Sequence, residues 1–194
     1  MARQIAYDPI ALRTNLLSVF WRQGYAETSL NDLEAATGLN RRQLYNGPGD
    51  KLAMFLKAMD DFADQAGRMF LAPLEVETAG VREIANLLDT FVELSQAKEG
   101  PKGCLVCSVS QEEVSAVPEV HTRAEAYFDR IKAAYCNALT QAAKRNEVNL
   151  NSEDIAQRNA RLFAAHVALC ILGRAGRPVD ELRAIAADAV ADLS

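Results

Sequence analysis

Two short helical patterns joined at a single glycine constrain this chain more than any other feature. The stretch 24–51 reads GYAETSLNDLEAATGLNRRQLYNGPGDK. In its first pattern Ser29 can cap a helix, with Asp32 at the distance of a reciprocal capping box. In its second pattern Asn40 can cap the next helix, with Gln43 at the same distance. This layout predicts a helix-turn-helix.

The residues at the start of the second helix suit contact with duplex DNA. An arginine can donate two hydrogen bonds to guanine, and a glutamine can pair with adenine, when a helix enters the major groove by its N-terminus. Hydroxyl and ammonium groups nearby can donate to phosphate. A short exposed helix with two solvated arginines is the alternative interpretation. The predicted base-contacting residues are Asn40, Arg41, Arg42, Gln43 and Tyr45, and the predicted phosphate-contacting residues are Thr28, Ser29 and Lys51.

The first 60 residues or so resemble those of TetR-type one-component transcriptional repressors. The resemblance implies an all-helical homodimer with an N-terminal operator-binding head. It also implies a C-terminal domain that binds an inducer and thereby releases the DNA. The residues that carry the resemblance are Ala11, Leu17, Phe20, Gly24, Tyr25, Thr28, Ser29, Leu33, Ala36, Gly38, Leu44, Tyr45, Asp50, Lys51 and Leu56.

One position departs from the family pattern. Members of the family usually carry an aromatic residue, most often phenylalanine, where this chain has Pro48. Residues 47–49 read Gly-Pro-Gly, which stops a helix and offers no large side chain for the core of the head. Loss of a buried phenylalanine typically costs about 3–5 kcal/mol where the site cannot collapse. A less stable head, or a helix-turn-helix protein that has lost DNA binding, is therefore an alternative.

The distribution of charge favours the head as the part that meets DNA. The formal charge of the chain is −5. Residues 1–51 carry six basic and five acidic side chains, whereas the remaining residues carry 15 basic and 21 acidic ones. Phosphate therefore meets less repulsion at the head than at the acidic body.

The rest of the chain predicts more helices and an all-α fold. Asp8 and Pro9 mark a first helix that ends at Gly24. Further helical patterns run from 51 to about 71, from 81 to about 99, from 104 to about 115, from 118 to about 146, from 152 to about 173, and from 179 to about 193. We expect a three-helix DNA-binding head at 1–50 and a ligand-binding and dimerisation domain at 51–194.

Cys104 and Cys107 have the spacing of a redox pair or of half a zinc site. A cysteine at a helix N-terminus has a favoured thiolate, so Cys104 is the thiol expected to be activated. Two small buried apolar side chains are the alternative. A thiol sensor, or a redox enzyme that uses both cysteines, also fits this spacing. Because a second such pair is missing, no metal site is predicted.

The body is expected to hold a small apolar or electrophilic inducer between its helices. The two terminal helices are apolar enough to pack against their copies in a homodimer, an arrangement that resembles dimers of the family. A monomer that buries these helices internally is the alternative. The predicted cavity-lining residues are Phe62, Phe91, Cys104, Tyr127, Phe128, Tyr135 and His166.

The sequence predicts a regulator rather than an enzyme. It holds no catalytic serine, histidine and aspartate set, no metal-ligand cluster and no phosphate-binding loop, so neither a cofactor nor an enzymatic activity is expected. The longest apolar run, 162–172, is interrupted by His166 and is too short to cross a bilayer. The N-terminus lacks the apolar core of a signal peptide. A cytoplasmic location without a membrane partner is the resulting expectation.

Overall fold

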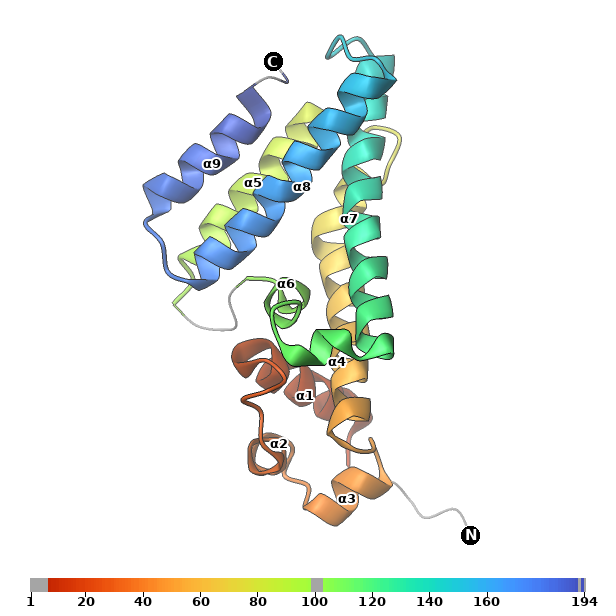
Figure 1. The fold of residues 1–194 in the computed structure, drawn as a ribbon, viewed down its shortest axis with the longest axis vertical. Helices are drawn as coiled ribbons and strands as arrows, with labels where there is room; N and C mark the ends of the chain where they lie inside the picture. The colour runs from red at the N-terminus through yellow and green to blue at the C-terminus, as the bar shows by residue number, and fades with distance from the viewer. Residues whose placement is uncertain (1–6, 99–102, 192, 194) are drawn as a thin grey trace.

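The chain folds into a small helical head and a larger helical body (Figure 1). The structure is a computed structural model, and it describes residues 7–98, 103–191 and 193. Within these residues every regular element is a helix or a helical turn. The α-helices are α1 (Pro9–Gln23), α2 (Leu30–Thr37), α3 (Arg41–Asn46), α4 (Lys51–Ala66), α5 (Val81–Ser95), α6 (Leu105–Val109), α7 (Pro118–Lys144), α8 (Ser152–Arg174) and α9 (Val179–Ala191).

The helix starts of the head follow the predicted caps. The side chain of Asp8 accepts a hydrogen bond from the backbone of Ile10, and Pro9 opens α1. Capping boxes open both α2 and α3, at Ser29 and at Asn40 respectively. Each box satisfies amide groups that a helix N-terminus leaves without a partner. The predicted helix-turn-helix is therefore confirmed.

An aromatic and leucine core holds the head together and joins it to α4. Phe20 of α1 and Phe55 of α4 pack edge to face, with ring centroids 5.1 Å apart. Leu33 of α2 and Leu44 of α3 are fully buried in the same core. Because each helix contributes at least one of these side chains, the position of α3 depends on α1 and α4.

The head compensates in part for its missing aromatic residue. Pro48 is itself buried, and its carbonyl group accepts a hydrogen bond from Lys57 at 2.8 Å. The hydroxyl group of Tyr7 lies beside Gly47, where a Cβ atom would collide with it. A cavity of about 360 Å³ remains between Tyr7, Pro48 and Leu16 of α1. The segment thus buries a small ring in place of a large aromatic one, and the site is not completely filled.

α4 joins the head to the body and changes its helical form on the way. It continues into a π-helical turn, Gly67–Leu71, and then into a short 3-10 turn, Ala72–Leu74. A π-turn shifts the faces of the residues that follow it. Met69, in this turn, is 67% exposed. α7 runs alongside α4 (Figure 1).

In the rest of the body, α5, α8 and α9 pack against one another, and α7 packs against α8. Two predicted helix ends need correction. α5 ends at Ser95 rather than near residue 99. α6 ends at Val109, and a separate 3-10 turn, Glu113–Ala116, follows it. α8 starts at Ser152 as predicted, and Asn151 caps it, because the Asn151 side chain accepts from two amide groups. Among the described residues, no helix has the length and apolar character needed to cross a membrane.

The head and the body are also joined through the C-terminal end of α1. The guanidinium group of Arg174 in α8 donates to the carbonyl groups of Trp21 and Arg22, at 2.8 Å each. The indole N–H of Trp21 donates to the carbonyl group of Gly103 at 3.0 Å. α4 is therefore not the sole connection between the two parts.

A carboxylate of the body completes this junction. Glu112, between α6 and α7, accepts hydrogen bonds from the backbone amides of Tyr25 and Ala26, at 3.1 and 2.7 Å. Gly24 has a positive φ of 83°, and a Cβ atom at Gly24 would collide with that carboxylate. The turn between α1 and α2 is thus held by a side chain 86 positions later in the chain.

Candidate nucleic-acid interface and ligand cavity

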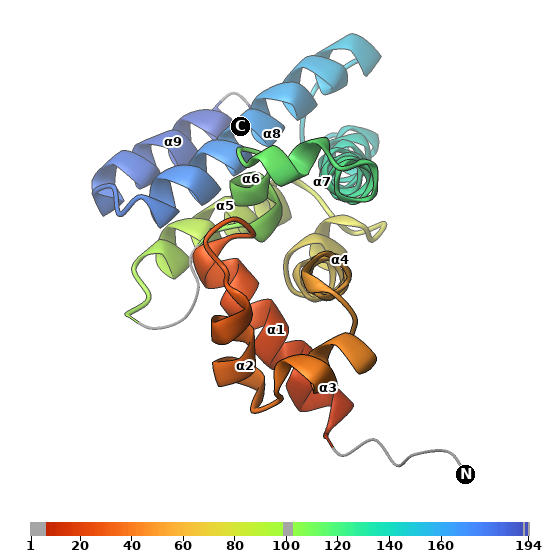
Figure 2. The same cartoon turned by 60° about the horizontal axis from the view of Figure 1, so that its bottom comes forward.

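α3 presents its first turn at the outer end of the head. Figure 2 shows α2 and α3 at the end of the molecule that is remote from α8 and α9. Arg41, Arg42 and Tyr45 are exposed, and Tyr45 retains 51% of its accessible surface. The side chain of Leu44 anchors the opposite face of α3 in the core. These three side chains are therefore placed where a nucleic acid can reach them.

Arg41 is exposed, but it already has partners within the head. Glu34 of α2 accepts from the backbone amide of Arg41 at 2.7 Å and from its Nε at 3.4 Å. Its Nη2 donates to the side chain of Asn31 at 2.8 Å. A base contact by Arg41 requires the exchange of these interactions.

Asn40 and Gln43 are both engaged at the start of α3. The Asn40 side chain accepts from the amide of Gln43 at 3.0 Å, and the Gln43 side chain accepts from the amide of Asn40 at the same distance. These side chains, predicted as base contacts, therefore shape the helix first. Base contact by either one must coexist with the cap or replace it.

The predicted phosphate contacts are placed differently from one another. Ser29 is exposed at the start of α2, although its hydroxyl is shared with Asp32. The ammonium group of Lys51 lies 4.3 Å from the ring centroid of Tyr25. Thr28 is 1% exposed, and its hydroxyl donates to the carbonyl of Gly24 at 2.6 Å. The predicted phosphate contact by Thr28 is corrected, because its donor is used inside the head.

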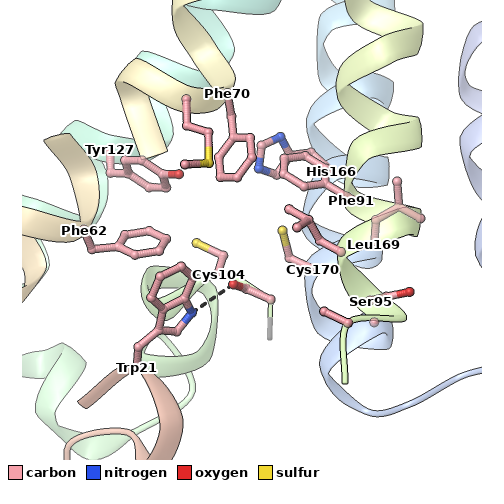
Figure 3. Close-up of a pocket in the computed structure, with 15 residues that line it drawn as sticks. Trp21, Phe62, Phe70, Phe91, Ser95, Cys104, Tyr127, His166, Leu169 and Cys170 are labelled. Carbon is pink, nitrogen blue, oxygen red and sulfur yellow. Dashed lines mark hydrogen bonds between the residues drawn. The ribbon is translucent and has the colours of Figure 1, made fainter. Parts of the chain in front are cut away.

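A cavity of about 280 Å³ lies between the head and the helices of the body. Figure 3 shows Trp21, Phe62 and Tyr127 on one side, Phe91 and His166 on the other, and Cys104 and Cys170 between them. Five of the seven residues predicted to line a ligand site border this cavity, namely Phe62, Phe91, Cys104, Tyr127 and His166.

The other two predicted residues lie behind the cavity wall. Phe128 packs against Phe163 of α8, with ring centroids 5.7 Å apart. Tyr135 is fully buried, and its hydroxyl lies 3.2 Å from Nδ1 of His166, with which it shares a hydrogen bond. Tyr135 therefore supports a wall residue rather than lining the cavity itself.

Several lining residues were not predicted from the sequence. Met69 and Phe70 come from the π-helical turn, and Cys170 comes from α8. Trp21 belongs to α1 of the head. A hydropathy pattern assigns each residue to a face of its own helix, but it does not reveal which distant segment covers that face. The sequence offered no signal for the wall contributed by Trp21.

The cavity wall carries no charged side chain among the residues described. Its polar groups are Ser95, the thiols, the hydroxyl of Tyr127, the indole of Trp21 and the imidazole of His166. Burial lowers the pKa of His166 from 6.5 to about 3, so this imidazole is neutral near pH 7. Burial also raises the pKa of Tyr127, which keeps its hydroxyl protonated. The site therefore suits an uncharged, largely apolar occupant.

The thiols differ from the prediction made for them. Cys104 does cap α6, and its Sγ accepts from the amide of Cys107 at 3.4 Å. Burial nevertheless raises the pKa of Cys104 well above its usual value. For Cys107, a hydrogen bond with Cys104 lowers the pKa, but a hydrogen bond with Cys170 and burial outweigh it. The expected activation of Cys104 by the helix N-terminus is wrong, because desolvation dominates.

No redox or metal centre is assembled around these thiols in the described part of the chain. All four cysteines are free, and Cys104, Cys107 and Cys170 are buried. No group of three or more histidine, cysteine, aspartate or glutamate side chains in residues 7–98 and 103–191 is placed to hold a metal ion. The geometry gives no support to a redox enzyme built on Cys104 and Cys107.

The exposed α3, its supporting helices and the enclosed apolar cavity define a helix-turn-helix regulator. The family profile described as "Tetracyclin repressor-like, C-terminal domain" matches residues 80–186. This chain belongs to the TetR family of transcriptional regulators.

Known proteins of similar sequence and fold agree with this assignment. The uncharacterized HTH-type transcriptional regulator YezE of Bacillus subtilis (strain 168) is 24% identical over 183 residues, which cover 94% of each protein. The HTH-type transcriptional repressor ComR of Escherichia coli (strain K12) is 29% identical over 105 residues, covering 54% of this chain and 50% of ComR. A cysteine mutant of the TetR family regulator CifR, complexed with 26bp double-strand operator DNA, has the same fold. Its TM-score is 0.85 at 22% identity, over 97% of this chain and 98% of that one.

We expect the buried thiols to resist alkylation in the folded protein. With iodoacetamide near pH 8, Cys136, which is partly exposed on α7, should be labelled several times faster than Cys104 and Cys107. The reason is that burial limits access and raises the pKa of both Cys104 and Cys107. Mass spectrometry of tryptic peptides over time gives the rates, with guanidinium-unfolded protein as the control. Labelling of Cys104 as fast as Cys136 in the folded state would contradict this assignment.

We expect the stability of the protein to decrease as the pH is lowered, because His166 titrates at a different pH in the folded and unfolded chains. Its pKa is 6.5 when unperturbed and about 3 in the fold. Between these values the unfolded chain binds a proton that the folded chain does not. The free energy of unfolding should therefore decrease by about 1.4 kcal/mol per pH unit as pH falls.

Denaturant titrations at several pH values measure this slope. His166→Gln should flatten it, whereas His121→Gln, at an exposed position on α7, should leave it unchanged. An equal slope in the parent protein and in His166→Gln would show that another group is responsible.

Proposed function

We propose that this chain is a ligand-responsive transcriptional repressor that binds a palindromic operator as a homodimer in the cytoplasm. An uncharged apolar molecule that enters the cavity releases the operator. The observation that carries the proposal is the exposed first turn of α3, with Arg42 and Tyr45 directed to solvent on a helix anchored by Leu44. DNA recognition by such a turn matches the way helix-turn-helix proteins read the major groove.

The structure divides the predicted DNA contacts into two groups. Arg42 and Tyr45 can contact bases without loss of a structural role, whereas Asn40, Arg41 and Gln43 also stabilise the start of α3. Ser29 and Lys51 remain candidates for phosphate contacts at the edge of the head. The operator complex of the similarly folded CifR mutant supports a duplex DNA partner.

The cavity supports an uncharged inducer of modest size. Its volume is about 280 Å³, and its wall is aromatic, aliphatic and thiol-bearing. A charged ligand would lose its hydration without meeting an opposite charge. An electrophilic ligand could alkylate Cys104 or Cys170, which both border the cavity, although the raised pKa of Cys104 makes that thiol a slow nucleophile.

The outward faces of α8 and α9 support the proposed homodimer. Helices with small side chains can approach each other closely, and a two-fold interface brings the same face of each chain together. On α8, exposed or partly exposed alanines recur every four residues, at Ala156, Ala160, Ala164 and Ala168. On α9, the exposed Ala184 and Ala187 lie beside the charged Arg183 and Asp188.

We expect Arg42 and Lys51 to affect DNA binding in different ways. A duplex operator selected from a random pool gives the reference affinity, measured by fluorescence anisotropy at several salt concentrations. Arg42→Ala should relax the preference at one base pair and cost about 1–3 kcal/mol. Lys51→Gln should weaken all sequences alike and reduce the salt slope by about one unit.

The matched control is Lys144→Gln, which removes an equal charge from the far end of α7. This variant should retain both the affinity and the salt slope of the parent protein. If the parent selects no sequence even at low salt, the proposal fails, and the head is one that has lost DNA binding. Recovery of binding in Pro48→Phe would then identify the open site beside Pro48 as the cause.

We expect a single negative charge introduced on the outward face of α8 to dissociate the proposed dimer into monomers. Ala164→Glu places two carboxylates near each other at a two-fold interface, where each lacks hydration. Sedimentation velocity should show dimers of the parent protein and monomers of the variant. Ala133→Glu, at an exposed position on α7, should remain dimeric. A dimer of unchanged affinity in Ala164→Glu would place the interface elsewhere.

A further inference from the structure

Trp21 is a residue of the DNA-binding head that forms part of the wall of the ligand cavity. It lies in the last turn of α1 and is the single tryptophan of the chain. Its ring packs edge to face on Phe62, with centroids 4.9 Å apart, and its N–H donates to the carbonyl of Gly103 (Figure 3). An occupant of the cavity is therefore in position to touch the head directly.

The partner of this hydrogen bond, Gly103, packs closely against α8. Gly103 has a positive φ of 71°, and a Cβ atom there would lie 2.4 Å from the carbonyl oxygen of Cys170. Gly103 and Cys170 both line the cavity. The indole of Trp21 is thus hydrogen-bonded to a wall residue that packs closely on α8.

The same turn of α1 is held by α8. Arg174 donates to the carbonyl groups of Trp21 and Arg22 and directly follows Gly173, another lining residue. Both carbonyl groups belong to the end of α1, where the helix itself supplies no amide partner for them. The cavity wall and the attachment of α1 therefore share one segment of α8.

The position of this turn also determines where the helix-turn-helix begins. Glu112 holds the amides of Tyr25 and Ala26, and α2 starts at Leu30. The Tyr25 ring packs against Phe55 at 5.0 Å and lies under the ammonium group of Lys51. A shift of the end of α1 is therefore passed to α2 over a few residues of tightly held backbone.

We propose that Trp21 is the residue through which the head senses the cavity. An occupant displaces the indole from Gly103 and loosens the contact of α1 with α8, so that the head leaves its DNA-binding orientation. This inference rests on the proposed function and adds a route through α1 that does not pass along α4. Ligand binding in the cavity and operator binding by the head are coupled, so each ligand changes the affinity for the other by the same factor.

Two variants with different roles test this route. Trp21→Phe retains an aromatic ring but lacks the N–H group that reaches Gly103. Arg174→Gln keeps Trp21 in the cavity wall and removes the guanidinium group that holds α1. Arg145→Gln is the matched control for Arg174→Gln, because the Arg145 guanidinium group also donates to two backbone carbonyl groups, those of Glu77 and Ala79, but within the body and away from the cavity.

The experiment measures the affinity of the full-length protein for its selected operator, with and without saturating phenylnaphthylamine, an uncharged aromatic probe. Emission from Trp21 should decrease through energy transfer as the probe binds. The probe should lower the operator affinity of the parent protein by about fivefold or more, which is the lower end of usual allosteric coupling. That factor should fall below about twofold in Trp21→Phe and Arg174→Gln, and remain near the parent value in Arg145→Gln.

A reciprocal measurement needs no added ligand. Binding of the operator to the parent protein should change the emission of Trp21 and its quenching by acrylamide, whereas unspecific competitor DNA should not. Coupling of parental size in both Trp21→Phe and Arg174→Gln would overturn the role of Trp21. An emission of Trp21 that does not change when the operator binds would also overturn this role. Failure of the parent protein to bind any DNA is seen separately by anisotropy and would overturn the proposed function itself.

Discussion

A helix of six residues is too short to be stable in water on its own, so α3 depends on its surroundings for its shape. The capping box at Asn40 supplies its first partners, and the side chain of Leu44 ties it to the core of the head. That core is formed by α1, α2 and α4, which in turn hold the head against the body. The position of the proposed base-contacting side chains therefore depends on packing that lies behind α3.

The sequence was sufficient wherever the interacting residues are neighbours. The caps at Asp8, Ser29 and Asn40 and the break at Gly38 involve partners two to four positions away, and all of them occur as predicted. The helical patterns of the body also supplied five of the seven predicted cavity residues correctly. Caps and turns of this kind depend on residues close together in the sequence, so they can be predicted without knowledge of the fold.

The sequence was insufficient where burial or a distant partner decides the outcome. Cys104 stands at a helix N-terminus as predicted, but its desolvation by distant helices reverses the expected effect on its thiol. Thr28 appeared available for DNA, yet it is enclosed in the head. Trp21 meets Gly103 across 82 positions of the chain. None of these contacts follows from the periodicity of a single helix.

The Glu34 carboxylate accepts hydrogen bonds from the backbone amide and the Nε of Arg41, so it occupies donors that an anionic group of DNA could otherwise use. Under the proposed function, duplex DNA would compete with Glu34 for the Arg41 side chain, so the net gain from Arg41 would be smaller than that from an arginine held only by water. Such an arrangement weakens nonspecific binding to any polyanion more than binding to the operator sequence, because neighbouring specific contacts compensate for the loss at the operator. A residue of α2 that never touches a base can in this way sharpen the choice of binding site.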